Sequence, residues 1–165
     1  KAFRLPIKSG DELNRFLEFA DEKVYGRKHS LFRWEKILSN ETIQNNLLNN
    51  QLIKEKSDLV DLNIIDRSFS GRVIKLEITL KNLKKPIVLV KDDIRRILSF
   101  LPSNLFTINK LNDNLWLFKG GGFGHGVGLS QSGAIEMAEL GFTYEQILNH
   151  YYKGTKIKKI EISSQ

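Results

Sequence analysis

Six of the chain's twelve glycines stand in one nine-residue stretch, Gly120-Gly121-Gly122-Phe123-Gly124-His125-Gly126-Val127-Gly128. A glycine adopts left-handed backbone angles that other residues avoid, and its lack of a Cβ leaves room for another molecule. The stretch follows a predicted strand and precedes a predicted helix, where free backbone N–H groups point into the gap. We therefore expect residues 120–131 to form the wall of a binding site.

Three common glycine motifs do not fit this stretch. A phosphate-binding loop ends in Gly-Lys followed by Ser or Thr, whereas this stretch ends in Gly128-Leu129-Ser130. No register of the dinucleotide pattern G-x-G-x-x-G places a glycine at the third position. The nucleophile elbow G-x-S-x-G has its second glycine one residue late, at Gly133. Nucleotide binding, dinucleotide binding and serine hydrolysis are therefore disfavoured.

The polar residues of the stretch suggest a different ligand. His125 stands between Gly124 and Gly126, so no local side chain buries it, and near neutral pH an imidazole donates, accepts or carries charge. A structural hydrogen-bonding role is the alternative. Ser130 is placed to cap the following helix, and the amide of Gln131 suits sugar hydroxyl and acetamido groups.

The rest of the chain alternates short helical and extended patterns, which predicts an α+β fold. Its sheet is mostly antiparallel and built from β-hairpins, with four to five short helices and the glycine-rich loop leading into one of them. Hydrophobic periodicity predicts helices over residues 9–21, 40–50, 92–101, 129–140 and 143–150 and strands over 59–65, 73–80, 87–90, 106–111, 115–118 and 155–162. Residues 22–38 are expected to be an irregular connection. No linker divides the chain, so residues 1–165 are expected to be a single domain.

Composition removes several classes of function. The chain has 165 residues and no cysteine, which excludes thiol nucleophiles, cysteine-ligated metals and disulfides. We expect no metal and no cofactor. No window approaches the roughly 18 apolar residues of a membrane span. The net charge of +7 favours an acidic partner, but the basic stretches 81–96 and 153–159 lack the interleaved aromatics that stack on bases. We expect no nucleic acid as partner, and basic nucleic-acid binding stays a second alternative.

A longer pattern of residues resembles a known family. The chain is similar to the C-terminal signature of the stage II sporulation protein D family, also called amidase enhancers, over about residues 32–160. The similarity rests on the run Gly122–Ala134, then Met137-Ala138, Gly141, Tyr144, Ile147-Leu148, His150-Tyr151-Tyr152 and Gly154-Thr155, with the upstream Arg67-Ser68-x-Ser70-Gly71-Arg72 hairpin and Phe106-Thr107-Ile108 in the expected order. The chain therefore resembles the C-terminal part of a larger domain of this kind.

The resemblance implies a role in the bacterial cell envelope, outside the cytoplasm. Members of the sporulation type are lytic transglycosylases that cleave peptidoglycan glycan strands stripped of their stem peptides, and they cooperate with a cell-wall amidase. One carboxyl group is enough for this chemistry, because it can protonate the glycosidic oxygen and then deprotonate the 6-hydroxyl of the sugar. An export signal or anchor is expected upstream of Lys1.

The sequence departs from the family at the catalytic acid. The family's glutamate, in a Glu-Met-Pro-like segment followed by a helix resembling Leu-Lys-Ala-Gln-Ala-Val-Ala-Ala-Arg-Thr, has no counterpart here. The catalytic residue is thus unknown, and whether the chain is an enzyme stays open. Either it is part of a larger enzyme whose acid lies before Lys1, or it is a non-catalytic glycan-binding module or an activator of a cell-wall amidase.

The resemblance assigns substrate-binding residues position by position. They are Gly124, His125, Gly126, Ser130 and Gln131 in the glycine segment, with Ser70, Arg72 and Tyr151 as further candidates. A plain turn at Gly71 is the alternative reading for Ser70 and Arg72. Tyr151 and Tyr152 are expected either to stack on sugar faces or to pack the last helix, and Trp34 is equally explained as a core residue.

Overall fold

The computed structural model describes residues 6, 7, 9–19 and 24–158, which form two compact units. The first unit contains the described residues up to 19 together with residues 30–125, and the second contains residues 24–29 and those from 126 onward. The described residues hold five helices and two three-stranded antiparallel sheets, which confirms the predicted α+β fold. The strands belong to two sheets rather than one.

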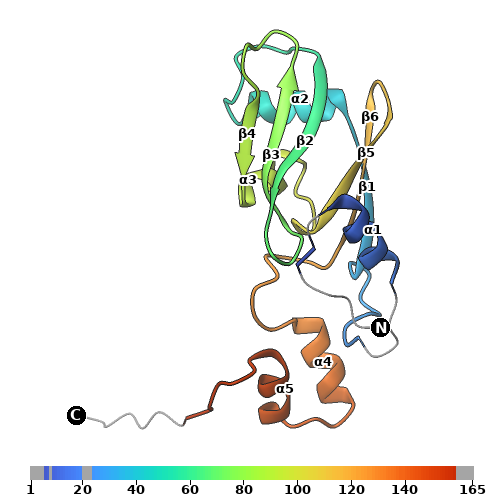
Figure 1. The fold of residues 1–165 in the computed structure, drawn as a ribbon, viewed down its shortest axis with the longest axis vertical. Helices are drawn as coiled ribbons and strands as arrows, with labels where there is room; N and C mark the ends of the chain where they lie inside the picture. The colour runs from blue at the N-terminus through green and yellow to red at the C-terminus, as the bar shows by residue number, and fades with distance from the viewer. Residues whose placement is uncertain (1–5, 8, 20–23, 159–165) are drawn as a thin grey trace, which may run out of the picture. The chain divides into compact units, whose positions relative to one another are not determined.

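The first sheet has β6 (Leu115–Gly121) at its centre, paired antiparallel with β1 (Arg33–Ser39) and with β5 (Phe106–Asn112). Strands β5 and β6 form the predicted hairpin (Figure 1). Its turn is stabilised locally, because the side-chain oxygen of Asn112 accepts a hydrogen bond of 2.8 Å from the backbone N–H of Asn114.

Strand β1 corrects the prediction of an irregular connection over residues 22–38. Trp34 and Leu38 are buried on one side of the strand, and Lys36 occupies the position between them on that side. The Lys36 amine donates a 2.5 Å hydrogen bond to the carbonyl oxygen of Ser99, and burial lowers the pKa of this amine. A charged residue at an inward position interrupts the apolar alternation, which is why the sequence pattern did not indicate a strand.

The second sheet has the order β2 (Leu59–Arg67), β3 (Val73–Leu80), β4 (Ile87–Val90). The alternation predicted for residues 73–80 is confirmed, because Leu76, Ile78 and Leu80 are buried on the inner face. Strands β2 and β5 each form a free edge of their own sheet.

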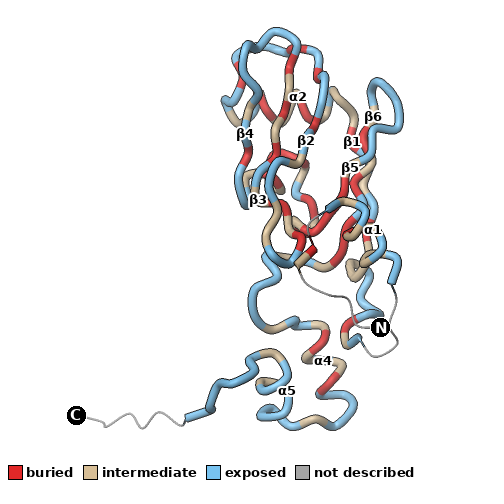
Figure 2. The backbone as a smooth tube through the Cα atoms, viewed as in Figure 1, coloured by how far each residue is buried: buried red, intermediate tan, exposed pale blue. Residues whose placement is uncertain are grey.

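Helices α2 (Asn40–Asn49) and α3 (Asp92–Ile97) supply the apolar side chains that join both sheets in one core. Ile43, Leu47, Ile94 and Ile97 are fully buried, and the burial runs through the interior of this unit (Figure 2). Helix α2 begins where the Ser39 hydroxyl accepts the backbone N–H of Thr42, as an N-cap does.

Helix α1 (Gly10–Glu18) begins with a capping box between Ser9 and Glu12. Its C-terminal end is held by the guanidinium of Arg33, which donates to the carbonyl oxygens of Phe16, Leu17 and Phe19. The same group lies over the rings of Phe16 and Phe32, so one side chain satisfies the free carbonyls of a helix end.

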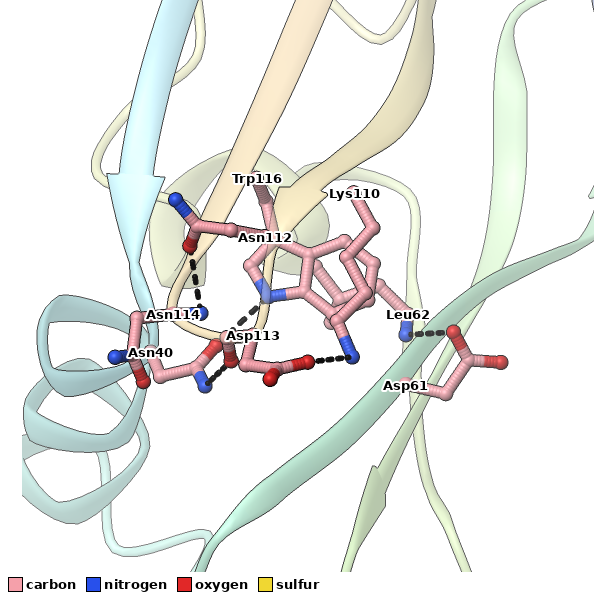
Figure 3. A network of polar contacts seen from close by, with 8 residues as sticks. All are labelled: Asn40, Asp61, Leu62, Lys110, Asn112, Asp113, Asn114 and Trp116. Atoms are coloured by element: carbon pink, nitrogen blue, oxygen red, sulfur yellow. Dashed lines mark hydrogen bonds and ion pairs between the residues drawn. The ribbon is translucent and has the colours of Figure 1, made fainter.

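A polar network fastens the start of α2 to the β5–β6 hairpin (Figure 3). The Asn40 side-chain oxygen accepts from the indole N–H of Trp116 at 2.7 Å, and its amide nitrogen donates to the carbonyl oxygen of Asp113 at 2.7 Å. Lys110 lies over the Trp116 ring and 3.7 Å from the Asp113 carboxylate. The two elements are thereby joined on the surface as well as in the core.

The second unit contains α4 (Gln131–Glu139) and α5 (Tyr144–Tyr151), near their predicted positions. Thr143 caps α5 in a capping box with Gln146. Residues 155–158 of the predicted final strand are not in a strand, and the rest of that segment lies outside the described residues. Over the described part of the chain, no helix has the length and apolar character needed to span a bilayer.

Candidate functional site

The first two glycines of the quoted stretch belong to the sheet. Gly120 and Gly121 are buried at the end of β6, and a Cβ on Gly120 would lie 2.2 Å from the Trp34 ring and 2.6 Å from the carbonyl oxygen of Leu105. Only a residue without a side chain allows this close approach. These two glycines therefore serve packing, and the expected wall of a binding site does not begin before Gly122.

The next four glycines have a different role, because Gly122, Gly124, Gly126 and Gly128 all adopt positive φ, between 70° and 94°. The residues between them are exposed: Phe123 at 69%, His125, and Val127 at 77%. A Cβ on Gly122 or Gly124 would meet no atom within 4 Å. The imidazole of His125 is thus presented beside open backbone, as the sequence predicts.

Within the first unit, the segment that leads to His125 is held by residues 102 and 103. The backbone N–H of Gly124 donates to the carbonyl oxygen of Pro102 at 2.8 Å, and Gly124 forms a parallel bridge with Ser103. The buried Ser103 hydroxyl donates to the carbonyl oxygen of Gly121 at 2.8 Å. These bonds fix the backbone next to the imidazole, which stays exposed.

The β2–β3 turn, which carries the predicted site residues Ser70 and Arg72, is built by its own contacts. Gly71 has φ +83° and lies against Ile7. The Ser70 hydroxyl is hydrogen-bonded to that of Ser68, and Arg67 donates to the carbonyl oxygen of Gly71. Burial lowers the pKa of Arg67 to about 10. For Ser70 the contacts match the turn reading.

Arg72 is different, because its side chain is half-buried and one terminal nitrogen of its guanidinium is buried without a hydrogen-bond partner. The backbone N–H of the next residue, Val73, donates to the carbonyl oxygen of Asn104 at 2.8 Å, and Asn104 follows directly after the Ser103 that pairs with Gly124. Burial, and secondarily the positive charge of Arg95, lowers the pKa of Arg72. Of the sequence-predicted residues in the first unit, Gly124 is therefore bonded to segment 102–104 directly, and Arg72 is the chain neighbour of Val73, which is bonded to the same segment.

The predicted residues of the second unit are mostly committed to its packing. The Ser130 hydroxyl caps α4 by accepting from the backbone N–H of Gly133, and the Tyr151 hydroxyl lies against Gly133 and bonds with Ser130. Tyr152 accepts from the backbone N–H of Leu129 at 3.1 Å. The hydroxyl groups of both tyrosines therefore contact residues of this unit, and the predicted residues Ser130 and Gln131 are exposed.

A cavity in the first unit contains none of the predicted site residues. It has a volume of about 820 Å³ and lies between the free edges of β2 and β5 and the start of α1. Its polar lining includes Asp11, Asn14, Asn63, Asp66, Thr107 and Asn109. These residues come from three separate segments without a motif, so no sequence signal could have found the cavity.

Three glutamates of the described chain have structural partners. Glu35 lies 2.9 Å from the amine of Lys119, and Glu136 accepts the backbone N–H of Gly26. A hydrogen bond from Tyr144 lowers the pKa of Glu145. Among the described residues, no three His, Asp or Glu side chains are grouped closely enough to hold a metal ion.

The fold and the segment around His125 define an α+β protein whose glycine-rich loop, presenting a histidine, follows a sheet strand and precedes a helix. Residues 2–128 match the family described as Domain of unknown function (DUF8618), and the chain belongs to that family.

Proteins of three further descriptions are similar to parts of the chain. An uncharacterised protein of Brachyspira hyodysenteriae is 32% identical over 126 residues, which are 75% of this chain and 32% of that protein. Stage II sporulation protein D of Bacillus subtilis is 52% identical over 40 residues, which are 24% of this chain and 12% of that protein. The amidase enhancer of Bacillus subtilis is 42% identical over 55 residues, 33% of this chain and 8% of that protein. The chain thus spans about a third or less of the length of these relatives, and its partial relation to the sporulation protein and the amidase enhancer agrees with the resemblance described above.

Proposed function

We propose that this chain binds the glycan strands of bacterial peptidoglycan at the surface around His125, in the cell envelope. The observation that carries the proposal is the open backbone at Gly122 and Gly124, beside the exposed His125 imidazole. An extended sugar chain can approach such a backbone closely, and an imidazole hydrogen-bonds to hydroxyl and acetamido groups. The similarity to a sporulation protein and an amidase enhancer supports a cell-wall ligand.

Glycan cleavage is proposed only together with a catalytic carboxyl group from outside the sequence given, because the family's glutamate segment has no counterpart here. A lytic transglycosylase needs one acid to protonate the glycosidic oxygen. The described Glu35 and Glu136 already have structural partners. The chain then serves as the glycan-binding part of a transglycosylase, or as a binding module that cooperates with a cell-wall amidase.

Retention on immobilised glycan strands from which an amidase has removed the peptides tests the proposal. We expect the wild-type chain to be retained and His125→Ala to bind about tenfold more weakly, the effect of losing one or two hydrogen bonds. His29→Ala is the matched control, because His29 is also exposed but lies on another segment. Absence of wild-type retention, or equal weakening by both substitutions, would overturn the proposal.

Product analysis separates binding from cleavage. We expect the chain alone to release no anhydro-muramyl sugars from peptide-free strands. Turnover by the isolated chain would show that one of its own carboxyl groups is the acid. A double-stranded DNA probe is the control for the basic surface, since nucleic-acid binding falls steeply as salt rises.

A further inference from the structure

The cavity between β2, β5 and the start of α1 lies where each of the two sheets ends in an edge strand. Residues 62–69, from β2 and the turn after it, form one wall, and residues 107–109 of β5 form another. In the described part of the chain, β2 pairs with β3 alone and β5 with β6 alone. Edge strands carry backbone N–H and C=O groups that can pair with a further strand.

The backbone of β2 directs two residues toward its free edge. In β3, the carbonyl oxygen of Ile74 faces β4, because it accepts from the backbone N–H of Lys91, and every second residue after it faces β4 too. Leu62 and Ile64 of β2 lie opposite two of these residues, so their own N–H and C=O groups point away from β3. Accordingly, the N–H of Leu62 donates at 2.9 Å to the side chain of the preceding Asp61 (Figure 3).

The edge of β5 offers groups of the same kind. The carbonyl oxygen of Leu105, directly before β5, faces β6, because it accepts at 3.0 Å from the N–H of Gly121. Phe106 and Ile108 therefore direct their N–H and C=O groups to the free edge. The carbonyl oxygen of Phe106 accepts at 3.0 Å from the guanidinium of Arg67, at the end of β2. This bond joins the two edges beside the cavity and fixes their spacing there.

The size of the cavity corresponds to a short strand. A strand takes up about 4.8 Å beside its neighbour, about 10 Å across its two faces and about 3.4 Å along the chain, which is about 160 Å³ per residue. The cavity volume of about 820 Å³ therefore accommodates about five residues. Residues 62–66 of β2, which line the cavity, are a stretch of that length. The exposed side chains of Ile65 and Phe69 add apolar surface to the lining.

The charges around the cavity favour a strand with a basic side chain. Asp11 of α1 and Asp66 of β2 line the cavity and are exposed. Neither carboxylate belongs to an ion pair within the described residues. Arg67, the basic residue of the lining, already donates to the carbonyl oxygens of Gly71 and Phe106. A Lys or Arg side chain entering the cavity would therefore meet two carboxylates without a basic partner.

We propose that the cavity between β2 and β5 is a docking site for an extended polypeptide strand of a partner protein, and that this strand carries a Lys or Arg side chain. Its backbone pairs with the outward groups of Leu62, Ile64 and Ile108, and its basic side chain pairs with Asp11 or Asp66. Alternating donors and acceptors on two edges match a polypeptide better than a sugar chain, because a polypeptide backbone alternates in the same way. The site shares no residue with the surface proposed to bind glycan, so the two proposals are tested separately.

The test selects seven-residue peptides from a displayed random library on the wild-type chain and then measures synthetic copies by calorimetry and amide hydrogen exchange. We expect the selected peptides to be enriched in Lys or Arg and in β-branched residues. Their binding should slow exchange of the Leu62, Ile64 and Ile108 amides by at least about tenfold. Methylating alternate backbone nitrogens of a peptide removes donors but keeps its side chains, and should weaken binding by about tenfold or more.

The carboxylates are tested by neutral variants. Asp11→Asn and Asp66→Asn are each expected to weaken the binding of a basic peptide about threefold, and together about tenfold. Asp92→Asn is the matched control, because Asp92 is also exposed but lies outside the cavity lining, and it should keep the wild-type affinity. Equal weakening by the control would overturn the site, since binding would then follow general surface charge.

Three other results would also overturn the proposal. The first is that no displayed peptide binds more tightly than about 1 mM, the weak end of specific binding. The second is binding that leaves exchange at Leu62, Ile64 and Ile108 unchanged or is insensitive to backbone methylation. The third is protection of these amides without peptide, either by a chitin oligosaccharide or by self-association of the chain, which would assign the cavity to a sugar or to a second copy.

Discussion

A methyl group added at Gly133 collides with one atom of the second unit. Gly133 lies buried inside α4, and a Cβ built there would be 2.1 Å from the hydroxyl oxygen of Tyr151. Ordinary contact begins at 3.4 Å, so the hydroxyl would have to move by about 1.3 Å. The next atoms, Ser130 Oγ and the carbonyl oxygen of Tyr25, lie at 3.3 Å. One hydroxyl group therefore accounts for most of the collision.

This geometry predicts a strong coupling between two substitutions. Gly133→Ala alone is expected to cost about 1–3 kcal/mol by overpacking, offset by about 1 kcal/mol of improved helix propensity. Tyr151→Phe alone is expected to cost about 1 kcal/mol, because it removes the hydrogen bond with Ser130. In the Tyr151→Phe background the collision is absent, so Gly133→Ala should become neutral or stabilising by about 1 kcal/mol. The expected coupling energy is thus about 1–3 kcal/mol.

Amide hydrogen exchange of the α4 residues is the suitable assay, because it reports the opening free energy of this unit separately from that of the first unit. The four proteins of the double-mutant cycle are compared at one pH and temperature. A coupling energy below about 0.5 kcal/mol would refute the reasoning, since Gly133→Ala would then act independently of the hydroxyl.

Three further predictions test the first unit. Gly120→Ala is expected to lower the free energy of unfolding by about 3 kcal/mol or more in chemical denaturation, because the added Cβ meets a buried indole ring and a carbonyl oxygen. Gly122→Ala should cost only about 1 kcal/mol, from backbone strain at its positive φ. Similar costs for the two substitutions would contradict the separate roles of these glycines. Arg33→Lys is expected to increase amide hydrogen exchange over residues 10–18, because an ammonium group lacks the planar guanidinium that donates to three carbonyl oxygens at the end of α1. Unchanged exchange would contradict the role of Arg33 at this helix end. Asn40→Ala is expected to lower the free energy of unfolding by about 1–3 kcal/mol, because it leaves the buried indole N–H of Trp116 unpaired. Asn49 is exposed, so Asn49→Ala should stay within about 0.5 kcal/mol of the wild type. Equal effects of the two substitutions would contradict the role of the Asn40 network.

Local patterns were sufficient where apolar alternation was uninterrupted. The strand over Val73–Leu80 is as predicted, and the helices capped by Ser39 and Thr143 lie close to the predicted ranges 40–50 and 143–150, because each depends on neighbouring residues only. Strand β1 was missed, since Lys36 fills an inward position and reaches the carbonyl oxygen of Ser99 far along the chain. The separation into two sheets also depends on distant pairing, which local patterns do not contain.

The candidate site was predictable in part. The exposure of His125 follows from the glycines on both sides of it, and the structure confirms it. The cavity lined by Asp11 and Asp66 could not be predicted, because its walls come from distant segments.

Some glycines of the family-like pattern are explained by packing and are not evidence of function. Gly120 and Gly133 are required by the close approach of Trp34 and Tyr151, so any chain with this packing would keep them whether or not it binds a ligand. A shared glycine pattern is thus partly a signature of the fold. The evidence that discriminates among binding module, enzyme part and inactive relative must come from side chains that packing does not explain. Among the predicted residues these include the exposed His125 and Gln131, and Arg72, one terminal nitrogen of which is buried without a hydrogen-bond partner. The glycan-binding experiment is therefore built on His125.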